Sequence, residues 1–221
     1  MRNIEVNMAH PSSGTQVARR LQREIPVGRG KSEGFTLIEM MVVVTIVGIL
    51  ATLAVVGYRK LVQSSHVSEA TNMVQNIRVA QEGYHSETQQ YANISKTFPS
   101  GNGASTGIFY PLATPTYLVM TGWGATCSTS ICPTTDWSVL PLHVDGPVLF
   151  GYATIAAGIG TTTFPQTPLT VNGTSMTVTP PAVSDWYAVA AEADLDGNPS
   201  TVTDVFAFSW TNQMFVSNEG Q

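Results

Sequence analysis

The feature that most constrains this chain is an apolar run from Phe35 to Gly57. It contains 23 residues and a single charge, that of Glu39. As an α-helix the run would be about 34 Å long, and the hydrocarbon core of a bilayer needs about 20 residues. In lipid the backbone must satisfy its own hydrogen bonds, which forces a helix despite the many Val and Ile residues. The run therefore predicts a membrane-spanning helix over residues 35–57.

Glu39 is the exception inside this run. A carboxylate at bilayer depth costs about 2.5–3.5 kcal/mol on insertion scales, so such residues are candidates for a function. Two simpler interpretations stay open. Near the N-terminus of a helix a carboxylate favours the helix dipole, or its side chain reaches back to the lipid headgroups.

The charges of the chain are divided unevenly around the run. Residues 1–34 carry six Lys or Arg and three Glu, a net charge of +3, whereas residues 35–221 carry four Lys or Arg and twelve Asp or Glu, a net charge of −8. By the positive-inside rule this predicts a cytoplasmic leader, 1–34, and a body outside the membrane. An acidic body also predicts no binding of nucleic acid. Met8 is an alternative start of the chain.

Beyond the apolar run the pattern predicts an amphipathic helix over residues 58–92. Apolar side chains recur there in steps of three and four, at Ala70, Met73, Val74, Ile77, Ala80 and Tyr84. Residues 93–221 predict a β-rich domain, with a short strand at 116–120 and runs at 147–155, 169–178, 185–192, 204–210 and 213–217. The pair Asn172-Gly173 predicts a hairpin. The expected fold class is α+β, with a long N-terminal helix packed on a C-terminal antiparallel sheet.

Two cysteines, Cys127 and Cys132, follow the apolar run. If the basic end is cytoplasmic, they reach an oxidising compartment, where a structural disulfide is expected. Free or redox-active thiols are the alternative. Four residues separate the two cysteines, instead of the two of a typical catalytic redox pair.

The segment EADLDGNPSTVTD contains a candidate calcium site. Glu192, Asp194 and Asp196 alternate before Gly197, as in the first half of a calcium-binding loop, and Asn198 and Asp204 offer further oxygens. Thr203 stands where such a loop has its bidentate Glu, so an acidic β-turn without metal is the competing interpretation. The four histidines have no metal-ligand spacing, and we find no catalytic or phosphate-binding pattern. The sequence therefore predicts no enzyme and no cofactor other than this possible calcium ion.

The junction of leader and run consists of Gly34, then Phe-Thr-Leu-Ile-Glu (35–39), then MMVVVTIVGILATLA. This junction resembles the N-terminus of type IV pilins and their pseudopilin relatives. The turn ADLDGN (193–198) and the end SNEGQ (217–221) also resemble C-terminal pieces of many pilins. The sequence departs from many pilins where they have a proline about 22 residues into the mature helix. Here the chain has Val56 and Gly57.

The resemblance implies a processing step and an assembly step. A prepilin peptidase would cleave between Gly34 and Phe35 and methylate the new amino group of Phe35. Glu39 would then pair with the Phe35 amino group of a neighbouring copy in a filament. Further implied partners are the assembly platform and motor of the pilus machine, and the membrane. The precursor would lie in a bacterial inner membrane, and the product in an extracellular pilus or a periplasmic pseudopilus.

Three functions follow as hypotheses. The first is a structural subunit of a type IV pilus-like filament. The second is a minor pilin or a pseudopilin of a type II secretion system. The third, of another class, is an uncleaved, membrane-anchored surface protein whose β domain binds a ligand.

Overall fold

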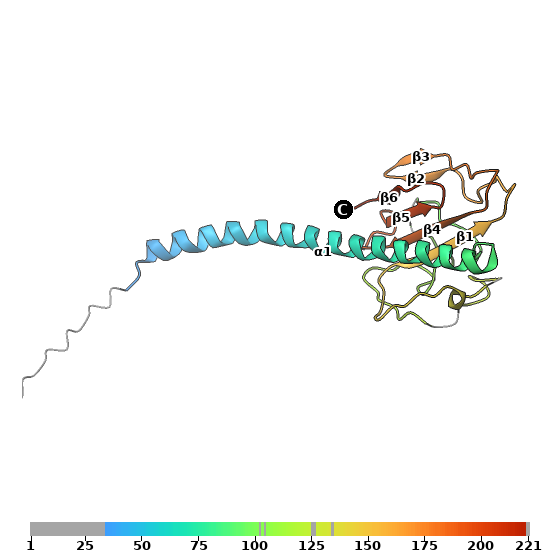
Figure 1. Ribbon diagram of the computed structural model, residues 1–221. Coiled ribbons are helices and arrows are strands. Elements are labelled where there is room, and N and C mark those ends of the chain that lie inside the picture. The colour runs from blue at the N-terminus through green and yellow to red at the C-terminus, as the bar shows by residue number, and fades with distance from the viewer. Residues whose placement is uncertain (1–33, 102, 104, 125–126, 134, 220–221) are drawn as a thin grey trace, which may run out of the picture. The chain divides into compact units, whose positions relative to one another are not determined.

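The computed structural model describes residues 34–101, 103, 105–124, 127–133 and 135–219. Its first element is the helix α1, Leu37–Thr88, of 52 residues (Figure 1). The leader 1–33 and the last two residues of the SNEGQ end lie outside the described residues.

The second half of α1 has one buried face. The buried side chains are Val67, Ala70, Met73, Val74, Ile77, Ala80 and Gln81. They include five of the six positions that the sequence predicts, and the sixth, Tyr84, packs against the same core while partly exposed. The predicted amphipathic period is therefore confirmed for this half of the helix.

The domain after the helix contains a four-stranded antiparallel sheet in the order β1-β4-β5-β6 (Figure 1). Its strands are β1 (Gly151–Ala157), β4 (Trp186–Ala193), β5 (Thr203–Phe208) and β6 (Met214–Ser217). The first three are buried along nearly their whole length. Both faces of the sheet are therefore covered along these three strands, and their buried residues include the polar Thr154, Glu192, Thr203 and Asp204.

Each face of the sheet has its own core, and β4 contributes to both. Tyr187, Val189 and Ala191 join the core that contains the buried face of α1. Trp186, Ala188 and Ala190 join the opposite core, which is rich in Phe side chains. Side chains alternate along a strand, so successive residues of β4 point into different cores. α1 covers one face of the sheet, and loops together with the hairpin cover the other. The predicted α+β fold, a long helix packed on an antiparallel sheet, is confirmed.

The predicted hairpin at Asn172-Gly173 is also present. It joins β2 (Leu169–Val171) to β3 (Thr174–Met176), which form a separate two-stranded sheet. Asn172 and Gly173 have φ angles of 49° and 73°. Positive φ at both central positions is what a tight two-residue hairpin requires, and Asn and Gly tolerate it best. The strand predicted at 116–120 is wrong, because residues 117 and 118 form a turn.

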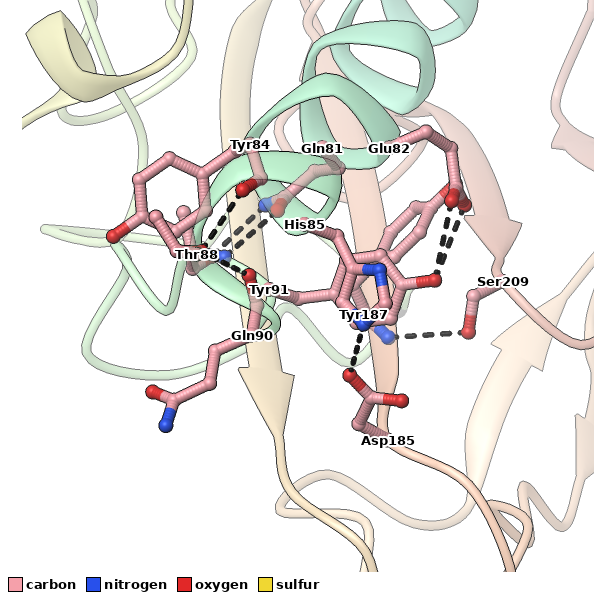
Figure 2. Close-up of polar contacts among 11 residues, drawn as sticks. Gln81, Glu82, Tyr84, His85, Thr88, Gln90, Tyr91, Asp185, Tyr187 and Ser209 are labelled. Carbon is pink, nitrogen blue, oxygen red and sulfur yellow. Dashed lines mark hydrogen bonds and ion pairs between the residues drawn. The ribbon is translucent and has the colours of Figure 1, made fainter.

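The end of α1 is held by side chains rather than by a glycine (Figure 2). Gln89 has a φ of 60°, and its backbone N–H donates to the carbonyl of His85 at 2.8 Å. The fully buried Gln81 amide accepts from the N–H of Ala92 and donates to its carbonyl, both at 2.9 Å. This pair of bonds replaces a helical continuation, so the helix stops at Thr88 and not at the expected residue 92.

Candidate functional site

The predicted cleavage junction lies directly before the helix. Gly34 and Phe35 have no regular secondary structure and are exposed. A Cβ placed on Gly34 would meet no atom within 4 Å. The folded chain therefore imposes no packing requirement for glycine at this position, and its bond to Phe35 is open to a protease.

Glu39 has a partner within its own chain. Its backbone N–H donates to the Oγ1 of Thr36 at 3.2 Å, and its carboxylate accepts from the backbone N–H of Thr36 at 3.4 Å. This reciprocal arrangement is a capping box, which satisfies two backbone donors at a helix start. Glu39 thus has a partner within its own helix as well as the Phe35 amino group that the resemblance implies. The pattern Thr-x-x-Glu, typical of a capping box, identifies Thr36 as this partner.

The first half of α1 is an uncovered apolar surface. Every residue from Gly34 to Leu61 is exposed, and the most apolar 18-residue window of the helix is 0% buried. Among the described residues, α1 is the one helix long and apolar enough to cross a membrane, judged by length and composition. An exposed apolar surface of this extent marks a membrane or protein interface.

The two cysteines are joined in a disulfide, as predicted, with their Cα atoms 5.9 Å apart. Asp136 supports this loop: one carboxylate oxygen accepts from the N–H of Cys127, and the other from the N–H of Ser138, both at 3.0 Å. The second bond caps a short 3₁₀ helix, Trp137–Val139. A loop Asp at an N-cap position is the signal that identifies such a residue.

The candidate calcium ligands fall into two groups. Glu192 on β4 and Asp204 on β5 are register partners and are both fully buried. Glu192 accepts from the backbone N–H of Ser105 at 2.7 Å. Both oxygens of Asp204 lie buried without an N–H or O–H donor from the described residues. Burial, as the largest cause, raises the pKa of Glu192 to about 7, and burial and the nearby Glu192 also raise the pKa of Asp204.

The other three candidates lie in the turn after β4 and use their oxygens within it. Asp194 accepts from the N–H of Gly197, Asp196 from the N–H of Asn198, and Asn198 from the N–H of Ser200. Within the described ranges, no three His, Cys, Asp or Glu side chains gather into a metal-binding group. The five residues thus do not converge on one point, and the calcium site stays a prediction.

Comparison with known proteins points to the N-terminal segment. The family model described as the prokaryotic N-terminal methylation motif matches residues 29–55. The type IV major pilin protein PilA of Myxococcus xanthus is 38% identical over 65 residues, which is 29% of this chain and 30% of that protein. The fimbrial protein EcpC of Eikenella corrodens is 44% identical over 55 residues, 25% of this chain and 36% of that protein.

A fimbrial protein of Moraxella nonliquefaciens is 32% identical over 75 residues, 34% of this chain and 49% of that protein. In these matches the chain spans less than half the length of each relative. No solved structure matches the chain. The shared part is therefore the methylation motif and the helix behind it, and in this segment the chain is similar to type IV pilins and fimbrial proteins.

Proposed function

We propose that this protein is the precursor of a structural subunit of a type IV pilus-like filament. The observation that carries the proposal is the exposed apolar half of α1 immediately behind a methylation motif. This surface must be covered by lipid before assembly. In a filament the same surface packs against the helices of neighbouring copies, so one segment serves both states.

Cleavage would create the positive charge with which the Glu39 carboxylate pairs. Cleavage after Gly34 creates an α-amino group on Phe35, four residues before Glu39. Within one copy the Glu39 carboxylate already caps the helix through Thr36. In the filament core it would also pair with the Phe35 amino group of an adjacent copy. A buried carboxylate needs such a partner, because an isolated ion in an apolar environment is very unfavourable.

The proposed steps of anchoring, cleavage and assembly each imply a partner. The precursor is anchored in the inner membrane with residues 1–34 in the cytoplasm and the β domain outside. A prepilin peptidase removes the leader and methylates Phe35, and the platform and motor of a pilus machine add the subunit to the filament. The matched relatives are a major pilin and a fimbrial protein, which favours this role over a minor pilin or a secretion pseudopilin. No observation favours the uncleaved ligand-binding protein.

Mass spectrometry of material sheared from the cell surface tests the proposal. A methylated peptide beginning at Phe35, abundant in sheared filaments, is the expected result. The same peptide confined to membranes would favour a pseudopilin or minor subunit. An intact peptide across Gly34 and Phe35 would refute the pilin proposal.

A matched pair of substitutions sharpens the test. Gly34→Ala should leave the chain at full length and abolish filaments. Gly83→Ala is the control: Gly83 lies in α1 beyond the apolar run, and a Cβ there also meets no atom within 4 Å. It should be cleaved and assembled normally, because the change removes a residue with poor helix propensity from an exposed site. Normal processing of Gly34→Ala would contradict the proposal.

A further inference from the structure

A second exposed apolar surface lies on the β domain, at Tyr117–Met120, which we call the apolar turn. Its four consecutive side chains are 50%, 47%, 41% and 54% exposed, in chain order. Isolated apolar side chains on a surface are ordinary, but a contiguous group indicates an interaction. The apolar turn has no role in the function proposed above.

The backbone of the domain holds the apolar turn in an unfavourable conformation. Leu118 has a φ of 49°, which is uncommon for a bulky residue other than glycine. Its N–H donates to the carbonyl of Asp194 at 3.4 Å, and the N–H of Val119 donates to the carbonyl of Thr116 at 3.2 Å. The ring of Tyr117 lies 3.5 Å from the point where a Cβ on Gly197 would be. Strain that the surrounding structure maintains is a sign of function.

The helix fixes the depth of the apolar turn. Tyr117 and Leu118 line a hollow of about 610 Å³ together with Tyr58, Arg59 and Lys60 of α1. These three helix residues directly follow Gly57, the last residue of the predicted span. At a rise of 1.5 Å per residue, they lie within about 5 Å of its end. If residues 35–57 cross the bilayer, the apolar turn is therefore at the level of the outer headgroups.

The charges at the hollow suit an anionic headgroup. Arg59 and Lys60 are two of the four Lys or Arg residues after Gly34, and both are exposed. Asp196, the acidic residue that also lines the hollow, accepts hydrogen bonds from the N–H of Asn198 and the Oγ1 of Thr201. Tyrosines and basic residues beside an apolar surface are typical of the membrane interface.

We propose that the apolar turn rests in the outer headgroup layer of the membrane, with Arg59 and Lys60 binding phospholipid phosphates. The β domain of the unassembled subunit is thereby held against the bilayer by a second contact besides α1. The proposal depends on the membrane anchoring contained in the proposed function, but not on cleavage or polymerisation. A subunit held in this way presents one side of its domain to incoming partners, since rotation about the helix axis is restricted.

Photocrosslinking of the full-length chain tests this contact. The chain is reconstituted in vesicles of phosphatidylethanolamine and phosphatidylglycerol, with p-benzoylphenylalanine in place of Leu118, Val47 or Val183, one at a time. Val183 is the matched control because it is apolar and 87% exposed. It lies two residues from Asp185, whose carboxylate pairs with His85 at 2.8 Å. Residue 85 is about 40 Å along the helix from Gly57.

The expected result is a phospholipid adduct at position 118, with a yield several-fold above that at 183. In the Arg59→Gln, Lys60→Gln double variant the phosphatidylglycerol adduct at 118 should fall several-fold, and an unchanged yield would overturn the role of these cations. A lipid adduct at 47 without one at 118 would overturn the proposal alone. An adduct at 118 to a second copy of the chain would overturn it in favour of a subunit interface. No lipid adduct at 47 would overturn the anchoring and this contact together.

Discussion

Glu39 has two separable roles, helix capping and pairing between subunits, and substitutions can distinguish them. Glu39→Ala removes both the carboxylate charge and the bond to the Thr36 N–H, which is 3.4 Å long. Glu39→Gln removes the charge but keeps an oxygen that can accept this bond, since Gln also completes a capping box. Thr36→Ala removes the Oγ1 that accepts from the Glu39 N–H at 3.2 Å and keeps the charge.

The two roles differ in magnitude. Loss of an N-cap side chain costs about 0.5–2 kcal/mol, and this cap is exposed, which favours the lower half of that range. Removing one partner of a buried ion pair costs about 3–5 kcal/mol. At about 1.4 kcal/mol per factor of ten, loss of the cap weakens subunit association by roughly tenfold or less. Loss of the pair weakens it by roughly a hundredfold to a few thousandfold.

The assay is the ratio of sheared filament to membrane-bound subunit for each variant expressed at the native level. We expect Glu39→Gln and Glu39→Ala to lose filaments alike, whereas Thr36→Ala keeps most of them. All three chains should insert in the membrane and be cleaved, because Gly34 and Phe35 are unchanged. Normal assembly of Glu39→Gln, with Thr36→Ala and Glu39→Ala equally defective, would refute pairing between subunits and leave capping as the role of Glu39.

Three further predictions concern the β domain and the face of α1 that covers it. Ile77→Ala should lower the free energy of unfolding by about 2–5 kcal/mol because Ile77 is fully buried. Val79→Ala, at a site 71% exposed, should change this free energy by about 0.5 kcal/mol or less. Thermal or denaturant unfolding of the detergent-solubilised chain measures both effects. Replacing Cys127 and Cys132 by Ser should cost about 2 kcal/mol for so short a loop, and adding reductant to the native protein should reproduce that loss. The pKa of Glu192 is raised from 4.5 to about 7. Between these two pH values the folded chain keeps the proton of Glu192, whereas the unfolded chain has released it. Stability should therefore be highest below about pH 4.5 with respect to this group and fall by up to about 1.4 kcal/mol per pH unit towards pH 7, and Glu192→Gln should flatten that slope in a pH series of unfolding curves.

Local patterns in the sequence predicted the elements whose causes are local. The apolar run makes a helix because the backbone has no other way to satisfy its hydrogen bonds in lipid. The three- and four-residue steps from Ala70 to Ala80 identify the buried face, since that period is the geometry of the helix itself. Asn172 and Gly173 identify a hairpin because they tolerate positive φ. The motif at Gly34, Phe35 and Glu39 likewise needs no tertiary information.

Contacts between distant residues decided the remainder. The strand 116–120 was predicted from its apolar composition, but the carbonyl of Asp194 and the backbone of Gly197 hold these residues in an exposed turn. The sequence predicted Glu192 and Asp204 as candidate calcium ligands of one loop. The register of β4 and β5 instead buries them side by side, and no local pattern encodes which strands pair.

The end of α1 depends in the same way on Gln81, whose amide also donates to the Oγ1 of Thr154 on β1 at 3.0 Å. A lone polar side chain on an apolar helix face does not reveal its partners, because they come from segments 11 and 73 residues away. The sequence by itself thus determined that the chain has an apolar helix with a processing motif and a β domain. Only the tertiary structure decided which polar groups that domain buries and which apolar side chains it leaves exposed, because those depend on the packing of segments that the chain order does not place together.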